Sequence, residues 1–233
     1  IDWSPVPRSN TTDANGYAEY YFNPDCEFLT GQQKWNAFFV GNPYYYANKS
    51  SDFTLYINST FNLTSNSIIE PNGDVYAYGS NVFAKGEVKD DCGLVTGAAV
   101  KFSVEGEPTT TCTASDNGDG TYECNLLTSG LGTGFYNVTM NVSKTYYQDA
   151  YTKKANAFQI RYSPELYNEQ VSPTSEGWGY NFTINVTAKD SDPGDVLNIY
   201  MWKSVGGDEW IQICLLYTSD AADEGLGVDL GGR

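Results

Sequence analysis

The stretch SDNGDGTYEC gathers carboxylate and amide side chains between glycines, and oxygen donors in such a pattern could bind calcium. An EF-hand type loop needs oxygen ligands at its first, third and fifth positions, a glycine at the sixth and a glutamate at the twelfth. Counted from Asp116, these later positions hold Gly118, Gly120, Thr121 and Leu127, so the calcium pattern is not met. Asn-Gly and Asp-Gly instead supply the positive-φ positions of a tight hairpin. We therefore predict a turn here, with calcium as the alternative.

The cysteines near this turn could form disulfide bonds, and four of them allow three pairings. A hairpin centred on Gly118 places Cys112 and Cys124 nearly opposite each other. This symmetry favours Cys112 with Cys124, which leaves Cys26 with Cys92, while Cys92 with Cys124 stays open as an alternative. A zinc site is the rival interpretation, and no CxxC pair supports it.

Asp190, Asp192 and Asp195 form a second cluster of hard oxygen donors, at the end of an expected strand. Such carboxylates are ligands that calcium prefers, so a calcium site is one interpretation. The other is a solvated acidic turn built around Pro193 and Gly194. Both interpretations stay open at the level of sequence, and we expect no cofactor other than this calcium.

Histidine is absent from the chain, which removes the usual general base and every Ser-His or Cys-His nucleophile pair. Carboxylate chemistry is untouched by that absence, but spacing singles out no pair among the 29 acidic residues. A Lys-Asn crosslink within a sandwich would need a buried lysine, whereas Lys101 alternates with Val100 and Phe102 and should point outward. We therefore predict no catalytic residue, and we expect that the chain is not an enzyme.

Asn-x-Ser/Thr triplets, the acceptor motif for N-linked glycans, recur along the whole chain. Their asparagines are Asn10, Asn48, Asn58, Asn62, Asn137, Asn141, Asn181 and Asn185. We predict a glycosylated exterior, and hence an extracellular or cell-surface location, where disulfide bonds also persist.

The charge of the chain excludes some partners. With 13 basic and 29 acidic residues, the formal net charge is -16, which repels phosphate backbones and anionic lipid surfaces. No apolar run approaches the roughly 18 residues of a bilayer span. The chain also begins at Ile1 without a methionine or a signal-like segment. We therefore expect no nucleic-acid partner, no direct membrane insertion, and a natural N-terminus further upstream.

The ending CLLYTSDAADEGLGVDLGGR lacks the alternation and the turn residues of the preceding sequence. It resembles the translation of a transposase-type sequencing-library adapter with a short index between its constant parts. We therefore expect residues 214–233 to be non-natural, and we leave Cys214 out of the disulfide count. The natural chain is then expected to be a metagenomic fragment that is truncated at both ends.

Alternation of apolar and polar residues with a period of two predicts β-strands along most of the chain. The stretches FTLYINSTFNLT, FYNVTMNVS and YNFTINVTA each place apolar side chains on one face and glycan acceptors on the other. Helix-like spacing is scarce. The predicted fold class is therefore all-β, with half-buried strands whose solvated faces carry the acceptor asparagines.

Turn and linker sequences divide the chain into parts. EPNGD is expected to be a turn or hinge, and RYSPELY a proline-containing linker. Residues 1–71 then form a partial β-rich segment, and residues 72–160 hold about six or seven short strands, enough for a β-sandwich. Residues 161–213 hold too few strands to close a second sandwich, and residues 214–233 are the expected adapter translation. The predicted architecture is a tandem of antiparallel β-sandwiches.

GEVKDDCGLVTGAAVKFSV, followed by DNGDGTYEC and GLGTGFYNVTMNV, resembles the immunoglobulin-like repeats of filamin and of invasin-like prokaryotic, notably archaeal, cell-surface glycoproteins. VSPTSEGWGYNFTINVTAKDSDPGDVLNIYMW is similar to the cadherin-like modules of such proteins. The resemblance covers about two thirds of the natural chain and implies a fold and a surface setting, not a chemistry. Its cadherin-like part implies calcium between domains. Leu94 departs from the repeats, which often have proline there.

These features favour a structural or adhesive module, such as part of a stalk or coat, in a secreted or surface-anchored glycoprotein. The alternative is a set of accessory modules of a secreted carbohydrate-active or proteolytic enzyme whose catalytic domain lies elsewhere. A third hypothesis is the ectodomain of a receptor. Expected partners are other surface-protein domains or glycans.

The aromatic run Tyr44 to Tyr46 must point to both faces of any strand. One or two of these rings then either stack on sugars or on a neighbouring subunit, or pack at the edge of their own domain.

Overall fold

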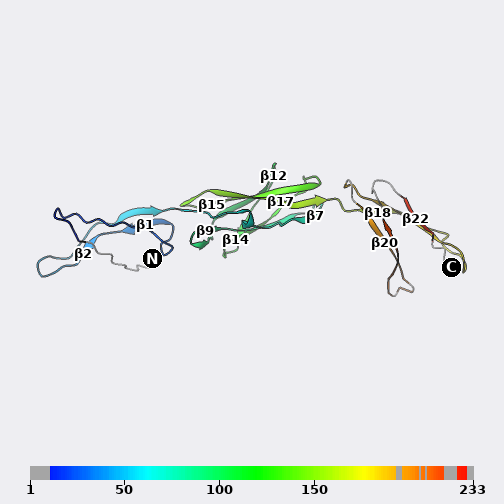
Figure 1. The fold of residues 1–233 in the computed structure, drawn as a ribbon, viewed down its shortest axis with the longest axis horizontal. Helices are drawn as coiled ribbons and strands as arrows, with labels where there is room; N and C mark the ends of the chain where they lie inside the picture. The colour runs from blue at the N-terminus through cyan, green and yellow to red at the C-terminus, as the bar shows by residue number, and fades with distance from the viewer. Residues whose placement is uncertain (1–10, 193–195, 205, 208, 218–224, 230–233) are drawn as a thin grey trace.

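The computed structural model describes residues 11–192, 196–204, 206–207, 209–217 and 225–229 of the 233-residue chain. These residues form β-strands joined by turns, with one short 3₁₀ turn, η1 (Ser65–Ser67), among them. Figure 1 shows an elongated molecule in which three parts follow one another along the long axis. The predicted all-β class is confirmed, and the middle part holds most of the buried residues.

The middle part is a sandwich of two sheets. One sheet has the strand order β13-β14-β8-β6, and the other has the order β12-β11-β15-β17-β7. The strands of the first sheet are β6 (Ile68–Glu70), β8 (Val82–Glu87), β13 (Ser115–Asp116) and β14 (Thr121–Leu126). Those of the second are β7 (Asp74–Ala77), β11 (Ala99–Val104), β12 (Glu107–Thr113), β15 (Gly134–Ser143) and β17 (Ala150–Arg161).

Alternation along these strands builds one core between the two sheets. In β11, Val100, Phe102 and Val104 are buried, while Lys101 between them is exposed. β15 follows the same pattern, and Met140 is fully buried. Each apolar side chain of this size stabilises the fold by about 1.5–3 kcal/mol on burial. The core is therefore the main source of stability in the described part of the molecule.

The pairing of the first two strands, β6 and β7, with strands of opposite sheets defines the topology of the sandwich. β6 pairs with β8 in an antiparallel manner, and after the turn that follows, β7 pairs in parallel with β17 in the opposite sheet. If β6 and β7 are strands A and A′ of an immunoglobulin domain, the two sheets read A-B-E-D and A′-G-F-C-C′. This is the immunoglobulin strand order, with the added C′ strand of the variable type. The middle part is an immunoglobulin-like sandwich.

A tyrosine corner marks the start of β15. The hydroxyl of Tyr136 donates a hydrogen bond to the carbonyl oxygen of Gly132 at 2.9 Å. In immunoglobulin domains a tyrosine near the start of strand F makes this bond, two residues before a core cysteine. Here Val138 has that position and is fully buried. Apolar packing thus takes the place of the disulfide bond that joins the two sheets of antibody domains.

The chain changes sheets after Thr113, one residue beyond Cys112. β12 pairs with β11 in the five-stranded sheet, whereas β13 pairs with β14 in the four-stranded sheet. Ala114 lies at the crossing, and its N–H donates to the carbonyl oxygen of Val100 at 2.9 Å. The expected hairpin with Cys112 and Cys124 opposite each other is therefore too long. Only β13 belongs to it, because β12 is held by its hydrogen bonds to β11.

The first part of the chain is a two-stranded ribbon. β1 (Gly31–Trp35) pairs with β4 (Phe53–Ile57), and β2 (Phe38–Phe39) pairs with β3 (Asn48–Lys49). Among residues 11–60, Gly31 alone is buried. A ribbon of two strands with so little buried surface depends on its neighbours for stability.

The sandwich begins before the predicted boundary at residue 71. β5 (Ser59–Thr60) pairs in parallel with β16 (Tyr147–Gln148), which lies between β15 and β17 in the chain. Phe61 and Ile68 are both buried in the core cluster. These apolar side chains complete the sandwich, so residues from about 59 onward belong to it rather than to the N-terminal part.

The third part contains two small sheets. One comprises β18 (Glu165–Ser172), β19 (Thr183–Lys189) and β22 (Gly225–Asp229), and the other β20 (Asn198–Lys203) and β21 (Ile211–Tyr217). Its buried cluster within the described ranges consists of Val186, Ala188 and Ile199. β21 and β22 extend into residues 214–233, and their origin as an adapter translation stays a prediction.

Replacing Tyr136 by phenylalanine removes the hydroxyl of the tyrosine corner and keeps the ring. We expect the free energy of unfolding to fall by about 0.5–1.5 kcal/mol, the net contribution of one hydrogen bond, in urea unfolding of the full chain. Tyr151→Phe is the matched control, because Tyr151 is 73% exposed and loses only a solvated hydroxyl. Equal losses in the two variants would contradict this role of Tyr136.

Candidate functional site

The carboxylates of the SDNGDGTYEC turn accept hydrogen bonds from the chain itself. Asp116 accepts from the N–H of Gly97 at 2.5 Å and from that of Gly118 at 2.8 Å. Asp119 accepts from the hydroxyl of Thr121 at 2.6 Å and from its N–H at 2.9 Å. These bonds lower the pKa of each carboxyl group below its ordinary value, those from Gly97 and from the Thr121 hydroxyl most strongly. Both carboxylates therefore order a turn, as the sequence predicts.

Gly120 is required where another loop crosses this turn. Its φ is +83°, and a Cβ at this position would lie 2.8 Å from the Cβ of Leu94. Leu94 is the residue that departs from the resembling repeats. Its side chain lies against the turn, so a larger residue than glycine would force the two loops apart.

Two disulfide bonds connect separate parts of the fold. Cys112 of β12 and Cys124 of β14 join the two sheets, with their Cα atoms 6.1 Å apart. Cys26 of the N-terminal part joins Cys92, between β9 (Lys89–Asp90) and β10 (Gly93–Leu94). These are the pairings that hairpin symmetry favours, but the first links sheet to sheet and not two strands of one hairpin. Each closed loop stabilises the fold by about 2–4 kcal/mol through the restricted unfolded chain.

Aromatic contacts surround the attachment of the ribbon, which we name the first junction. The ring of Tyr147 stacks on Phe61 with centroids 4.7 Å apart, and Tyr56 stacks on Tyr146 at 5.8 Å. The hydroxyl of Tyr147 donates to a carboxylate oxygen of Asp90 at 2.9 Å, and burial raises the pKa of this tyrosine. The first junction is thus held by the Cys26–Cys92 disulfide bond and the stacking of Tyr56 on Tyr146, beside a partly buried hydroxyl.

The acidic cluster near residue 190 lies at the second junction, between the sandwich and the third part. Asp192 accepts a hydrogen bond from the N–H of Tyr162 at 2.8 Å, and its own N–H donates to Asp190 at 3.0 Å. Tyr162 also contacts Tyr78, with ring centroids 4.9 Å apart. Asp195 lies outside the described residues. Calcium at this cluster stays a prediction, and within the described ranges no group of three or more metal-ligating side chains is found.

The side chain of Asn137 makes hydrogen bonds at an irregularity in the pairing of the five-stranded sheet. Its Nδ2 donates to Glu105 at 2.7 Å, and its Oδ1 accepts from the N–H of Asn156 at 2.8 Å. The pairing of β15 with β17 shifts register beside it, and Asn156 has a φ of 47°. Lys153 completes the cluster through an ion pair of 3.0 Å with Glu105. The hydrogen bond from Asn137, followed by that from Lys153, lowers the pKa of Glu105.

This Asn-Glu-Lys cluster has the residue types of an intramolecular amide crosslink, but the wrong charge state. Amide formation needs a neutral lysine amine and a protonated carboxyl group to assist it. The side chains of Lys153 and Glu105 are 46% and 45% exposed, and the hydrogen bonds from Asn137 and Lys153 lower the pKa of Glu105, which disfavours the protonated carboxyl group that the reaction needs. The more buried lysine is Lys154, whose Nζ donates to the carbonyl oxygens of Ile68 and Ile69. Lys101 is exposed, as predicted.

The predicted glycan acceptors have different surroundings. Asn10 lies outside the described residues. Asn137 is half-buried and its acceptor nitrogen is engaged by Glu105. The remaining acceptors are exposed: Asn48, Asn58, Asn62, Asn141, Asn181 and Asn185. Glycosylation stays a prediction, and the structure favours Asn141 over Asn137 on the same strand.

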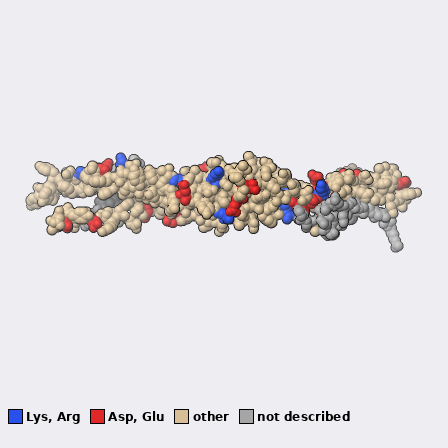
Figure 2. All heavy atoms as spheres, turned by 90° about the horizontal axis from the view of Figure 1, so that it is seen from above, with Lys and Arg blue, Asp and Glu red and all other residues tan. Residues whose placement is uncertain are grey.

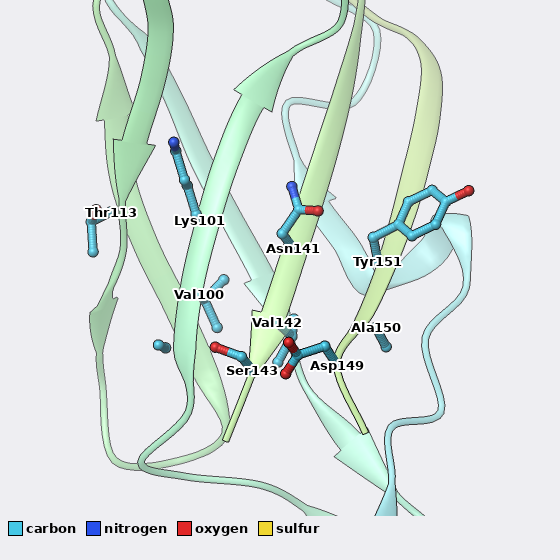
Figure 3. Close-up of a pocket in the computed structure, with 10 residues that line it drawn as sticks. Val100, Lys101, Thr113, Asn141, Val142, Ser143, Asp149, Ala150 and Tyr151 are labelled. Carbon is cyan, nitrogen blue, oxygen red and sulfur yellow. The ribbon is translucent and has the colours of Figure 1, made fainter. Parts of the chain in front are cut away.

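Asn141 lies in a hollow on the outer face of the five-stranded sheet, which we name the outer-face groove. Its volume is about 430 Å³, and Lys101, Tyr151 and Asp149 also line it. Figure 3 shows these side chains on neighbouring strands, with Asn141 between Lys101 and Tyr151. The groove contains no histidine or cysteine, and its one carboxylate is that of Asp149.

Charged side chains of both signs are mixed on the surface (Figure 2), whereas the aromatic run Tyr44 to Tyr46 is highly exposed. Figure 2 shows basic and acidic groups interspersed along the visible face. Tyr44, Tyr45 and Tyr46 are 86%, 67% and 96% exposed, so they do not pack at the edge of their own domain within this chain.

Within the described ranges, no helix has the length and apolar character of a membrane span.

Comparison with protein-family models and with curated proteins finds no match for this chain. Comparison with solved structures finds distant likenesses. One is a crystal structure of the N-terminal eight Ig domains of Down Syndrome Cell Adhesion Molecule, at 11% identity and a TM-score of 0.33, which covers 86% of this chain and 31% of that one. Another is the surface layer protein SbsC, domains 4-9, at 12% identity and a TM-score of 0.29, with 86% and 35% covered.

A further likeness is to the native conformation of E. coli alpha-2-macroglobulin, at 11% identity and a TM-score of 0.30. It covers 86% of this chain but only 16% of that chain. The present chain thus spans a small share of these longer proteins. The immunoglobulin-like class rests on the strand order and tyrosine corner described above.

Replacing Asn137 by glutamine should disrupt the irregular place in the sheet. The longer side chain cannot hydrogen-bond to Glu105 and to Asn156 at the same time. We therefore expect a loss of about 1–3 kcal/mol in the free energy of unfolding. Asn141→Gln is the matched control and should leave it unchanged. Both are measured by urea unfolding of protein from a non-glycosylating host, and equal losses would refute this role of Asn137.

Acid should weaken the turn that Asp116 orders. Because the folded-state pKa of Asp116 is lowered, its contribution to stability is present above the unfolded pKa and is lost as pH falls through the folded pKa. Asp116→Asn should therefore reduce the drop in the urea midpoint between about pH 5 and pH 2. Asp149→Asn is the control. An acid dependence that Asp116→Asn leaves intact would argue against this assignment.

Proposed function

We propose that the chain is a structural and adhesive segment of a secreted or surface-anchored protein, in which immunoglobulin-like modules form a spacer. The observation that carries this proposal is the first junction. There the Cys26–Cys92 disulfide and the stacking of Tyr56 on Tyr146 fix the N-terminal ribbon to one end of the sandwich. A fixed junction transmits orientation from one module to the next, which a spacer needs.

The second junction supports the same function. The N–H of Tyr78 donates to the carbonyl oxygen of Arg161 at 2.7 Å, and the ring of Tyr78 contacts Tyr162. Asp192 of the third part then holds the N–H of Tyr162. These contacts order the linker at the point where it leaves the sandwich, so both ends of the middle module are anchored.

The disulfide bonds support an extracellular setting. Such bonds form and persist in oxidising compartments, and here they join segments that are 66 and 12 residues apart. Six exposed acceptor asparagines among the described residues fit a glycosylated surface. Other surface-protein domains and glycans are the partners that we propose, and the exposed rings of Tyr44 and Tyr46 offer contact area for them.

Covalent connectivity gives this spacer a defined path for tension. In a chain pulled at its two ends, force passes from Cys26 directly to Cys92, and later from Cys112 directly to Cys124. The segments between these cysteines carry no load while the disulfide bonds are intact. They include the ribbon and the strand β7, which pairs with β17.

Single-molecule stretching of the full chain tests the proposal. In oxidising buffer, complete unfolding should release a contour length that is about 26 nm shorter than in reducing buffer, because loops of 66 and 12 residues stay closed. Cys26→Ser with Cys92→Ser should recover most of this length without reductant.

Cys112→Ser with Cys124→Ser is the matched control and should recover only the small remainder. Equal contour lengths in both buffers would show that tension does not pass through the disulfide bonds, and would refute a spacer built on them.

A further inference from the structure

The outer-face groove contains a row of side chains that come from three neighbouring strands. Lys101 of β11 is the register partner of Asn141 of β15, and Asn141 is the register partner of Tyr151 of β17. All three side chains are exposed on the outer face. Directly paired residues have Cβ atoms about 4.5–5.5 Å apart, so the amide of Asn141 has a cation on one side and an aromatic ring on the other.

Asn141 is a suitable acceptor for an N-linked glycan. It begins the triplet Asn141-Val142-Ser143, and because side chains alternate along a strand, the amide and the Ser143 hydroxyl share the outer face. Val142 between them is buried in the core and fixes the strand in this orientation. Asn137 on the same strand provides the contrast, since its amide is bound within the sheet.

Tyr151 is an open ring near the beginning of β17, where that strand pairs with β15 and not yet with β7. Its side chain is 73% exposed. Aromatic rings present an apolar face that stabilises contacts when it is covered, and the hydroxyl of a tyrosine can still hydrogen-bond at the edge. A sugar ring has one face of C–H groups, which is the complementary surface. A glycan that starts at Asn141 begins within reach of this ring.

We propose that the outer-face groove is filled by the glycan attached to Asn141, whose first sugar packs its C–H face on the ring of Tyr151. Lys101, on the opposite side of the acceptor, donates hydrogen bonds to the polar edge of the sugar. This inference rests on the proposed glycosylated surface and adds to it a built contact that holds one glycan against the sheet.

The experiment compares melting temperatures of the full chain, expressed in a glycosylating host, for four proteins. They are the parent, Tyr151→Ala, Asn141→Gln and the double variant. We expect Tyr151→Ala to lower the melting temperature several degrees more in the presence of the glycan than in the Asn141→Gln background. Ser143→Ala removes the acceptor triplet while keeping Asn141, and it should give the same result as Asn141→Gln.

Two controls separate the contact from general effects of the substitutions. Tyr151→Phe keeps the ring and should behave as the parent. Phe135→Ala removes another exposed ring of β15, 66% exposed and six residues from Asn141, and should show no dependence on the glycan.

Mass spectrometry of glycopeptides is run on the same samples, so that the two proposals can fail separately. If Asn141 carries no glycan, both this inference and the glycan part of the proposed function are overturned. If Asn141 is occupied and Tyr151→Ala has equal effects with and without the glycan, this inference alone is overturned.

Discussion

The rest of the structure depends on the packing of two sheets against each other in the middle part. That core takes in buried residues from β6, β8 and β14 of one layer and from β11, β15 and β17 of the other, and it includes Phe61 and Ile68 from beyond the predicted boundary. The neighbouring parts bury little: Gly31 in the ribbon, and a cluster of three apolar residues in the third part, among the residues described. Their positions are therefore set by covalent and polar contacts to the sandwich, which is why both junctions are rich in specific interactions.

Several acidic side chains in this protein accept hydrogen bonds from backbone N–H groups. Asp116 and Asp119 order the turn between β13 and β14, and Asp192 holds the linker at the second junction. Each of these carboxylates accepts a backbone N–H that would otherwise be satisfied only by water. Carboxylates used in this way have fewer free oxygen atoms for a metal, so the same residue types that suggest calcium in the sequence build the turns of the fold.

Two acceptor motifs on one strand have different surroundings. Asn137 and Asn141 both begin an acceptor triplet on β15, four residues apart, and both belong to its outward-facing set. Beside the register shift, the amide of Asn137 accepts the backbone N–H of Asn156, whereas the regular pairing at Asn141 leaves that amide in the groove between Lys101 and Tyr151. Local pairing, and not the motif, distinguishes a structural asparagine from an exposed acceptor.

The sequence by itself determined the all-β class, the turn at Asp116 to Gly120, the outward direction of Lys101 and the sandwich in the middle, because alternation and turn residues act over a few neighbouring positions. Only the tertiary structure decided the pairing of β12 with β11, the crossing at Ala114 and the engagement of Asn137. These depend on which strands meet across the sheet, and that choice is made by the whole core at once. The disulfide between Cys112 and Cys124 needed both the sequence and the tertiary structure. The symmetry of the turn in the sequence suggested the pair, whereas the crossing at Ala114 places the two cysteines in different sheets.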